Sequence, residues 1–278
     1  ACAKALGGVH VEEPEPEPGS AAAGRRTMAD WVPELNRTLR EDRLQLRVQK
    51  VTPLDPEAGA GAYYELFLGL RDESGNPIAP QDFLQAAEYY EQLVNLDRWV
   101  IRNVLRWMQD HARELAAAAG FAVNLSGASL AEGSMADYVT EQLLSAEVPP
   151  GKLWFEVPHS DTLGTLSNAE RFIHTVNGLG CRFALHRFGQ GGGQYGFLKD
   201  LPVDFVKIDG DFVRNMALSA SDLAVVRSVN EIAHMMGKRT VAEFVESEAV
   251  LVRLRDMGVD YAQGFYVDKP RYIEELSV

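Results

Sequence analysis

The chain has 278 residues, of which 46% are hydrophobic and 24% are charged, so it can bury a large core. This composition excludes a disordered, collagen-like or disulfide-stapled protein. Its 27 Lys and Arg are outnumbered by 40 Asp and Glu, and the formal charge of −13 disfavours DNA as a partner and requires a local site for any anionic ligand. No apolar run reaches the roughly 18 residues of a membrane span, and the two cysteines, Cys2 and Cys181, favour a reducing, cytoplasmic compartment.

The N-terminal segment differs in composition from the rest of the chain. Residues 11–24 read VEEPEPEPGSAAAG, in which alternating Glu and Pro cannot form a regular ladder and the Gly-Ser-Ala stretch is typical of a flexible tether. We therefore expect residues 1–27 to be a linker or the tail of a preceding domain. Residues 28–278 are expected to form one domain.

A short helix is predicted where this domain begins. Trp31, Leu35 and Leu39 share one helical face. Asp30 is a candidate cap, and Pro33 is tolerated only in the first turn of such a helix.

Two strands and a long helix are predicted next. Residues 44–51 and 62–71 have the pattern of strands. Asp97 is a candidate cap for a long helix. The apolar side of that helix is formed by residues at helical spacing: Val100, Val104, Trp107, Met108 and Leu115.

Strands and helices alternate through the remainder of the chain. The predicted strands contain the runs FAVNLS, KLWFEV, CRFAL, VDFVKI, KRTVAEF and DYAQGFYV. Amphipathic helical segments, such as residues 135–145 and 219–236, separate nearly all of them. This alternation predicts an α/β protein with a parallel sheet, and at this length a (β/α)8 barrel is the leading architecture. A doubly wound open sheet is the alternative, but no glycine-rich nucleotide fingerprint follows the first strand.

Polar side chains follow several of these apolar runs. In a parallel barrel the carboxyl ends of the strands meet at one mouth, so such side chains are predicted to share a site. They are Asn124, Glu156, His186, Arg187, Lys207, Glu243 and Gln263.

Four motifs resemble those of the EAL domain family. They are NLS at 124–126, LPVDFVKID at 201–209, AEFVES at 242–247 and AQGFYVDKP at 262–270, and the resemblance extends over about residues 30–272. The family consists of phosphodiesterases that cleave cyclic di-GMP in a (β/α)8 barrel whose first strand is antiparallel. The opening ACAKALGGVHV resembles the end of a GGDEF domain, which implies the C-terminal part of a GGDEF–EAL protein.

The resemblance implies a set of residues that bind cyclic di-GMP. Glu65, in YYELFLGLR, matches the signature glutamate of the family. The complete implied set is Gln49, Glu65, Leu66, Phe67, Leu68, Arg71, Asn124, Glu156, His186, Arg187, Lys207, Glu243, Phe244, Glu246 and Gln263. Vestigial catalytic positions within it are Glu65, Asn124, Glu156, Lys207, Glu243 and Gln263. We expect residues 66–68 to line the floor beneath the ligand, and Lys207 and Arg187 to face its phosphates.

This chain departs from the family pattern at several of those positions. The arginine four places after the signature glutamate is Gly69 here. The paired aspartates of DDFGTGYSS are replaced by His186 and Arg187, in HRFGQGGGQ. His159 replaces a second glutamate, and residues 191–193 are all glycine in a loop that active members use for metal control.

These departures bear on the chemistry that the resemblance implies. Active members use two divalent ions to activate a water molecule, and Mg²⁺ or Mn²⁺ requires several anionic oxygen ligands. Arg187 cannot lose its proton at ordinary pH and repels a cation. We therefore expect no bound metal or other cofactor, no two-metal centre of Mg²⁺ or Mn²⁺, and negligible hydrolysis.

The sequence is most similar to degenerate EAL receptors of the FimX type, which bind the dinucleotide and pass the signal to a protein partner. We therefore expect cyclic di-GMP and an unidentified signalling protein as partners, and the pattern is compatible with a homodimer. The alternatives are a residual phosphodiesterase and a nucleotide-free protein-interaction scaffold. Phe244 stands where active relatives have glycine, and it either stacks on a guanine or packs against a barrel helix.

Overall fold

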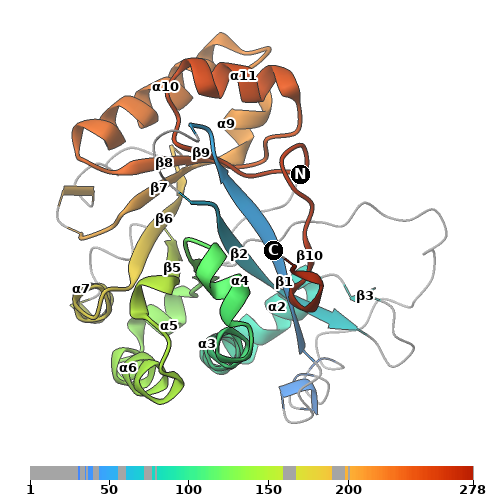
Figure 1. The fold of residues 1–278 in the computed structure, drawn as a ribbon, viewed down its shortest axis with the longest axis vertical. Helices are drawn as coiled ribbons and strands as arrows, with labels where there is room; N and C mark the ends of the chain where they lie inside the picture. The colour runs from blue at the N-terminus through green and yellow to red at the C-terminus, as the bar shows by residue number, and fades with distance from the viewer. Residues whose placement is uncertain are drawn as a thin grey trace.

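The computed structural model shows a closed barrel surrounded by helices (Figure 1). The structure describes residues 31, 35, 37–39, 44–55, 61–71, 77–78, 80–158, 167–189, 198–199 and 201–277. The predicted linker at residues 1–27 and the cap and proline predicted at Asp30 and Pro33 lie outside them. No helix in these ranges combines the length and apolar character needed to cross a membrane.

The strands of the described residues form one sheet that closes on itself. Its order is β10-β1-β9-β8-β7-β6-β5-β4-β2-β3, and an additional pairing between β1 and β2 completes the ring. The strands are β1 (Leu44–Pro53), β2 (Tyr63–Arg71), β3 (Pro77–Ile78), β4 (Phe121–Asn124), β5 (Leu153–Pro158), β6 (Arg182–Phe188), β7 (Phe205–Ile208), β8 (Arg239–Ala242), β9 (Tyr261–Ala262) and β10 (Arg271–Tyr272).

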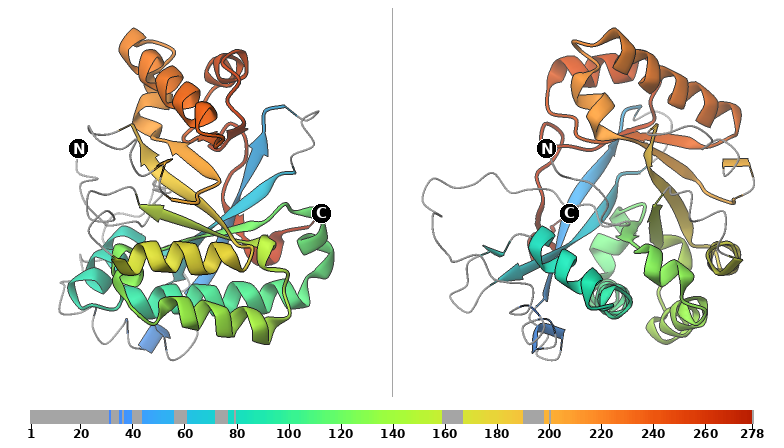
Figure 2. Two further views of the ribbon diagram at one scale, coloured as in Figure 1. Left: turned by 90° about the vertical axis from the view of Figure 1, so that its left-hand side faces the viewer. Right: turned by 180° about the vertical axis from the view of Figure 1, so that it is seen from behind.

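Helices cover the outside of the ring, with α9 to α11 on one side and α3, α5, α6 and α7 on the other (Figures 1 and 2). The helices are α2 (Pro80–Tyr89), α3 (Leu93–Asp110), α4 (Ala112–Ala117), α5 (Gly127–Ala131), α6 (Met135–Ala146), α7 (Ser167–Gly178), α9 (Gly210–Asn215), α10 (Ala220–Met235) and α11 (Glu248–Asp256). Short 3₁₀ turns lie at Pro150–Lys152 and Ile273–Glu275.

The direction of the strands confirms the predicted barrel with an antiparallel first strand. β1 is antiparallel to both β2 and β9, whereas the pairs from β2–β4 round to β8–β9 are parallel. A closed ring of parallel strands brings their carboxyl ends to one mouth. The open-sheet alternative is therefore wrong.

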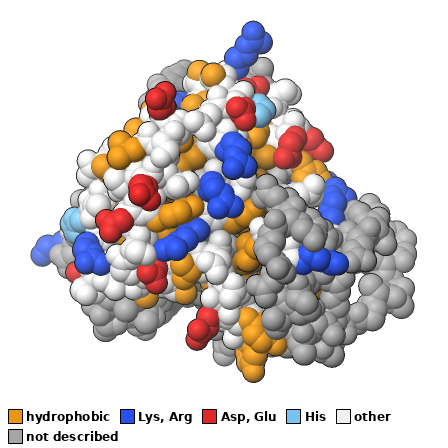
Figure 3. All heavy atoms as spheres, turned by 90° about the horizontal axis from the view of Figure 1, so that it is seen from below, with side chains coloured by type: hydrophobic (Ala, Val, Ile, Leu, Met, Phe, Trp, Pro, Cys, Tyr) orange, Lys and Arg blue, Asp and Glu red, His pale blue; other side chains and the backbone are white. Residues whose placement is uncertain are grey.

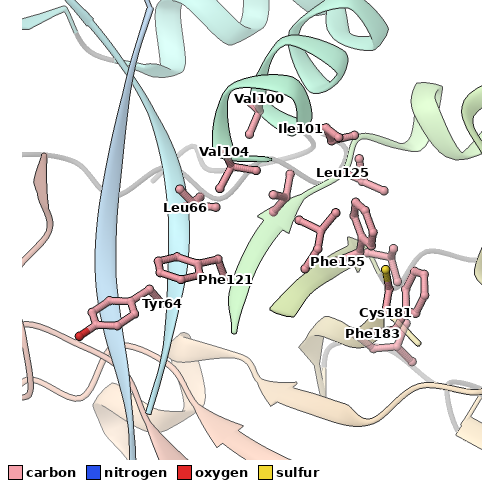
Figure 4. Close-up of a cluster of buried hydrophobic side chains, with 14 of the residues drawn as sticks. Tyr64, Leu66, Val100, Ile101, Val104, Phe121, Leu125, Phe155, Cys181 and Phe183 are labelled. Atoms are coloured by element: carbon pink, nitrogen blue, oxygen red, sulfur yellow. The ribbon is translucent and has the colours of Figure 1, made fainter. Parts of the chain in front are cut away.

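The main apolar core lies between the outer face of the strands and the helices. In Figure 4, Leu66 on β2 lies next to Val104 on α3 and near Phe121, and Phe155 lies farther round the sheet. Trp31 and Leu35 are helical and buried in the same core, and Leu39 packs against it, which confirms the predicted helical face.

A second apolar cluster fills the inside of the barrel. It contains one residue from each strand of the closed ring: Val51, Tyr63, Ala122, Trp154, Ala184, Phe205, Val241 and Tyr261. Its aromatic rings pack closely, with the Tyr63 and Trp154 ring centroids 4.5 Å apart. Because alternate residues of a strand face the same side, these side chains form the floor on which the next interior layer rests.

The prediction that Asp97 caps the long helix is wrong. Helix α3 begins one turn earlier, at Leu93, and Asp97 is buried inside it. Its Oδ2 accepts hydrogen bonds from the Ser126 amide at 2.8 Å, the Ser126 hydroxyl at 2.7 Å and the Ser129 hydroxyl at 2.6 Å. Asp97 therefore fixes the turn that follows β4. The helix also ends earlier than predicted, at Asp110, and Leu115 belongs to the separate α4.

Candidate functional site

A ring of polar side chains lies inside the barrel, one layer nearer the mouth than the apolar floor. Each member is two positions from a floor residue on the same strand or just past its end, so the alternation of strand side chains places both on the inner face. The eight members are Gln49, Glu65, Asn124, Glu156, His186, Lys207, Glu243 and Gln263. Sequence analysis predicted all eight, and the structure brings them together.

Glu65 is the centre of the hydrogen-bond network in this ring. Its Oε1 accepts from the Asn124 amide at 2.8 Å. Its Oε2 accepts from Lys207 Nζ at 2.6 Å and from Gln263 Nε2 at 2.7 Å. The same Gln263 nitrogen donates to Gln49 Oε1 at 2.8 Å, which ties β1 into the network. The signature glutamate thus accepts hydrogen bonds from three side chains, contributed by β4, β7 and the residue just past β9.

Lys207 is fully buried and is surrounded by three carboxylates. Its Nζ lies 2.6 Å from Glu65, 2.7 Å from Glu156 and 3.1 Å from Glu243. Burial alone would lower the pKa of the ammonium, but the carboxylates of Glu156, Glu65 and Glu243 outweigh it, so the pKa lies well above its ordinary value. An ammonium has three N–H donors, one for each of these contacts. These contacts engage the donors of Lys207, and its contact with a ligand phosphate stays a prediction.

The excess of carboxylates also affects their own protonation. Burial raises the pKa of Glu156 well above its ordinary value, and the nearby charge of Glu65 adds to the shift, while Lys207 opposes it. Glu156 consequently holds a proton more readily than an exposed glutamate does. Lys207 with Glu65, Glu156 and Glu243 is called the Lys207 cluster below. With one ammonium against three carboxyl groups, the Lys207 cluster has an excess of negative charge.

Three oxygens of the ring accept no hydrogen bond from the described residues. They are Asn124 Oδ1, Glu156 Oε1 and Gln263 Oε1, and each is buried. Buried acceptors of this kind are normally satisfied by a donor, because an unpaired polar atom is costly. They can accept from the N–H groups of a ligand that enters the mouth.

The two aspartate positions of the family lie at a bulge in β6. The register between β6 and β7 shifts between Leu185 and Phe188. Arg187, inside the bulge, has a φ of 58°, and the neighbouring His186 is buried with 2% exposure. Bulges are common beside functional sites, where they redirect a side chain. Asp and Asn adopt this left-handed backbone conformation more readily than Arg does. The aspartate that the family has at this position would therefore suit the bulge better than Arg187.

The antiparallel pair β1 and β2 continues past the ring as a wall of the mouth. Gln49 is paired with Glu65, and Phe67 follows on the same face. Leu66 and Leu68 face the opposite way: Leu66 is buried in the core formed with the outer helices (Figure 4), and Leu68 packs against that core. The prediction that residues 66–68 all line the ligand floor is therefore wrong for these two leucines, because successive strand residues alternate between faces.

The predicted residue Arg71 lies farthest along this wall. Its Nε donates to Gln45 Oε1 at 2.9 Å, and its guanidinium is 4.7 Å from the centre of the Tyr272 ring. The wall therefore carries positive charge at its outer end.

Phe244 and Glu246 lie outside the ring, against helix α9. The Arg214 guanidinium is 4.1 Å from the centre of the Phe244 ring, and its Nε donates to Glu246 at 3.0 Å. Phe244 covers Gly210, the first residue of α9, and has a φ of 53°. The structure thus shows the packing role that sequence analysis left open, and stacking on a guanine stays a prediction. The positive φ explains why glycine is the easier residue at this position.

Gly210→Ala is expected to lower the free energy of unfolding by about 1–3 kcal/mol, because its Cβ would lie 1.9 Å from Phe244 Cδ2. In a Phe244→Gly background the same substitution should be neutral or stabilising, since alanine is a better helix former by about 1 kcal/mol. Urea unfolding of the unsubstituted chain, the two single variants and the double variant measures both effects. Equal destabilisation in the two backgrounds would contradict the contact.

Two predicted departures fall outside the described residues, namely His159 and the glycines at 191–193. Within the described part of the chain, no three or more His, Cys, Asp or Glu side chains are grouped as a metal site. Sequence analysis missed the buried contacts of Asp97 with Ser126 and Ser129, which fix the backbone just after Asn124. The signals of that turn in the sequence were the NLS motif at 124–126 and Ser129, three residues after it.

Comparisons with known proteins agree with this geometry. A family model described as the EAL domain matches residues 33–270. Cyclic di-GMP phosphodiesterase PdeB of Shewanella oneidensis is 32% identical over 254 residues, which are 89% of this chain and 29% of that protein. Cyclic di-GMP phosphodiesterase PdeF of Escherichia coli is 30% identical over 250 residues, covering 89% of this chain and 33% of that protein. The chain thus spans about a third of the length of these curated relatives.

Solved structures with the same fold include complexes with the dinucleotide. The c-di-GMP complex of the PaMucR phosphodiesterase has a TM-score of 0.81 at 27% identity, covering 89% of this chain and 99% of that chain. The Xanthomonas citri FimX EAL domain in complex with c-diGMP has a TM-score of 0.79 at 27% identity, covering 90% of this chain and 96% of that chain.

Proposed function

Because this chain belongs to the EAL domain family, we propose that it binds cyclic di-GMP at the mouth of its barrel and does not hydrolyse it by a two-metal mechanism. The observation that carries this proposal is the complete polar ring, with buried acceptor oxygens on Asn124, Glu156 and Gln263. Guanine edges offer N–H donors to such oxygens. Similar domains from both phosphodiesterases and FimX proteins have been seen with the same dinucleotide.

The donor set does not suit a pair of divalent ions. Glu65, Glu156 and Glu243 already share the Lys207 ammonium within 3.1 Å. At the second aspartate position a metal would face the guanidinium of Arg187, which stays charged at any ordinary pH. Hard cations need several anionic oxygens, so these side chains favour a nucleotide receptor over a hydrolase. On this proposal, the output of the domain is contact with an unidentified signalling protein.

Calorimetric titration with cyclic di-GMP in EDTA tests the proposal. We expect saturable binding without metal, little change on adding Mg²⁺ or Mn²⁺, and no linear dinucleotide product by chromatography. The affinity should weaken with added salt, because a dianion approaches a few local cations on a negatively charged protein.

Two other results would favour the alternative functions. Turnover that requires metal and is abolished by Glu65→Gln would identify a residual phosphodiesterase. The absence of both heat and thermal stabilisation at millimolar dinucleotide would identify a nucleotide-free scaffold.

A further inference from the structure

A dianionic ligand needs positive charge above the polar ring. The Lys207 cluster has one ammonium against three carboxylates, and the donors of Lys207 are engaged by those carboxylates. The Lys207 cluster therefore repels a phosphodiester unless cations on the walls of the mouth offset its charge. The β1–β2 wall carries two arginines, Arg47 and Arg71, on its inner face.

Arg47 stands one layer above the ring. It is two residues before Gln49 on β1, is paired with Phe67, and is half-buried. Because alternate residues share a face, its side chain lies on the face that carries Gln49 toward the site. Sequence analysis missed this arginine, although its period-two spacing from Gln49 was the available signal.

The stem of Arg47 covers the position where the family's arginine is missing. A Cβ added to Gly69 would lie 3.5 Å from both Cγ and Cδ of Arg47. The Arg47 side chain thus lies against the backbone of Gly69. A residue with a long side chain at position 69 would occupy this space.

The guanidinium of Arg47 is held in place but retains donors. Its Nη2 donates to the Pro270 carbonyl at 3.0 Å, and it lies 5.9 Å from the centre of the Tyr272 ring. No carboxylate of the described residues forms an ion pair with it, so none of these carboxylates neutralises its charge. A guanidinium has several N–H groups in a rigid fork, and one carbonyl contact leaves others for an anion.

We propose that Arg47 donates to a phosphodiester oxygen of the bound cyclic dinucleotide, in place of the side chain that Gly69 lacks. This assignment rests on the proposed function. It makes Arg47 a binding residue for the phosphate part of the ligand, while the ring beneath it contacts bases and ribose.

Titration of Arg47→Gln with cyclic di-GMP tests the assignment. We expect Kd to rise about 10-fold or more, because a charge-assisted hydrogen bond is lost, and the dependence of Kd on salt to become weaker. Arg102→Gln is the matched control, since it removes the same charge from an exposed site on α3. Figure 3 shows basic side chains gathered across the middle of the face where α3 lies. The control should leave Kd within about 2-fold of the unsubstituted value.

Two further variants separate the contact from folding. Arg47→Lys keeps the charge without the fork and should give an intermediate Kd. Gly69→Arg in the Arg47→Gln background should restore much of the affinity, because the added Cβ has ordinary contact distances at that position. Thermal unfolding without ligand verifies that each variant is folded.

The outcomes distinguish this assignment from the proposed function. If the unsubstituted chain binds and Arg47→Gln and Arg47→Lys bind equally well, the assignment to Arg47 is wrong and the proposed function stands. If the unsubstituted chain binds no dinucleotide, the proposed function is wrong and the assignment is overturned with it.

Discussion

Lys207→Met is expected to lower the free energy of unfolding by about 3–5 kcal/mol at neutral pH, because it leaves buried carboxylates without their counter-ion. Lys207 is 0% exposed and lies within 3.1 Å of Glu65, Glu156 and Glu243. Burial already raises the pKa of Glu156, and without the opposing charge of the ammonium this pKa rises further above its unfolded value. The protonated form of Glu156 then favours folding at low pH, and this contribution is lost as pH rises through the folded-state pKa. The deficit should therefore be smaller at pH 5 than at pH 8.

Urea unfolding at both pH values measures this effect. Lys238→Met is the control, because Lys238 is half-buried at the start of the β8 region and should change stability by less than about 0.5 kcal/mol. A Lys207→Met protein as stable as the control, or a deficit that does not depend on pH, would contradict the ion cluster.

The stability difference between Asp97→Asn and the unsubstituted chain is expected to change by about 2–2.5 kcal/mol between pH 4 and pH 7. Burial raises the pKa of Asp97 from 3.8 to about 6, although hydrogen bonds from Ser129 and Ser126 oppose the shift. The folded state therefore binds this proton more tightly than the unfolded state. Asp97 favours folding most below its unfolded pKa, and the contribution is lost as pH rises through about 6. Asparagine carries no such charge, so the variant gains relative stability as pH rises.

Asp97→Ala provides the comparison for this experiment. It removes the acceptor from the Ser126 amide and from the Ser126 and Ser129 hydroxyls, and should cost at least about 2 kcal/mol at either pH. Chemical unfolding of the three proteins between pH 4 and pH 7 measures both effects. A stability difference between Asp97→Asn and the unsubstituted chain that is flat across this range would show that Asp97 has an ordinary pKa.

The order of elements and six of the eight ring residues could be predicted from local sequence, whereas Gln49 and Glu65 came from the family resemblance. Apolar runs such as FAVN and FVKI are short enough to be barrel strands, and a polar residue at or near their ends lies at the mouth in any parallel barrel. Asn124 and Lys207 were therefore predictable as site residues before any contact was known. The antiparallel first strand came from the family resemblance, and the pairing of β1 with β2 and β9 confirms it.

The start of helix α3 could not be predicted in the same way. An Asp before an apolar helical pattern is a common cap, and nothing local distinguishes a capping Asp from one buried in the second turn. The distinction depends on Ser126 and Ser129, which are about 30 residues away in sequence and supply the donors that make burial tolerable. Long-range hydrogen bonds of this kind are invisible to periodicity.

The sequence alone indicated which polar side chains follow the barrel strands, because apolar runs and their polar ends are local patterns. Only the tertiary structure decided what those side chains do for one another. Lys207 has the residue type of a phosphate ligand, yet closure of the ring places it within 3.1 Å of three carboxylates from other strands, which engage its donors. Arg47 has the residue type of a solvent-facing strand residue, yet its cross-strand contact with Gly69 places it over the site. Charge–charge energies depend on distance, and these distances are set only when strands far apart in sequence come together.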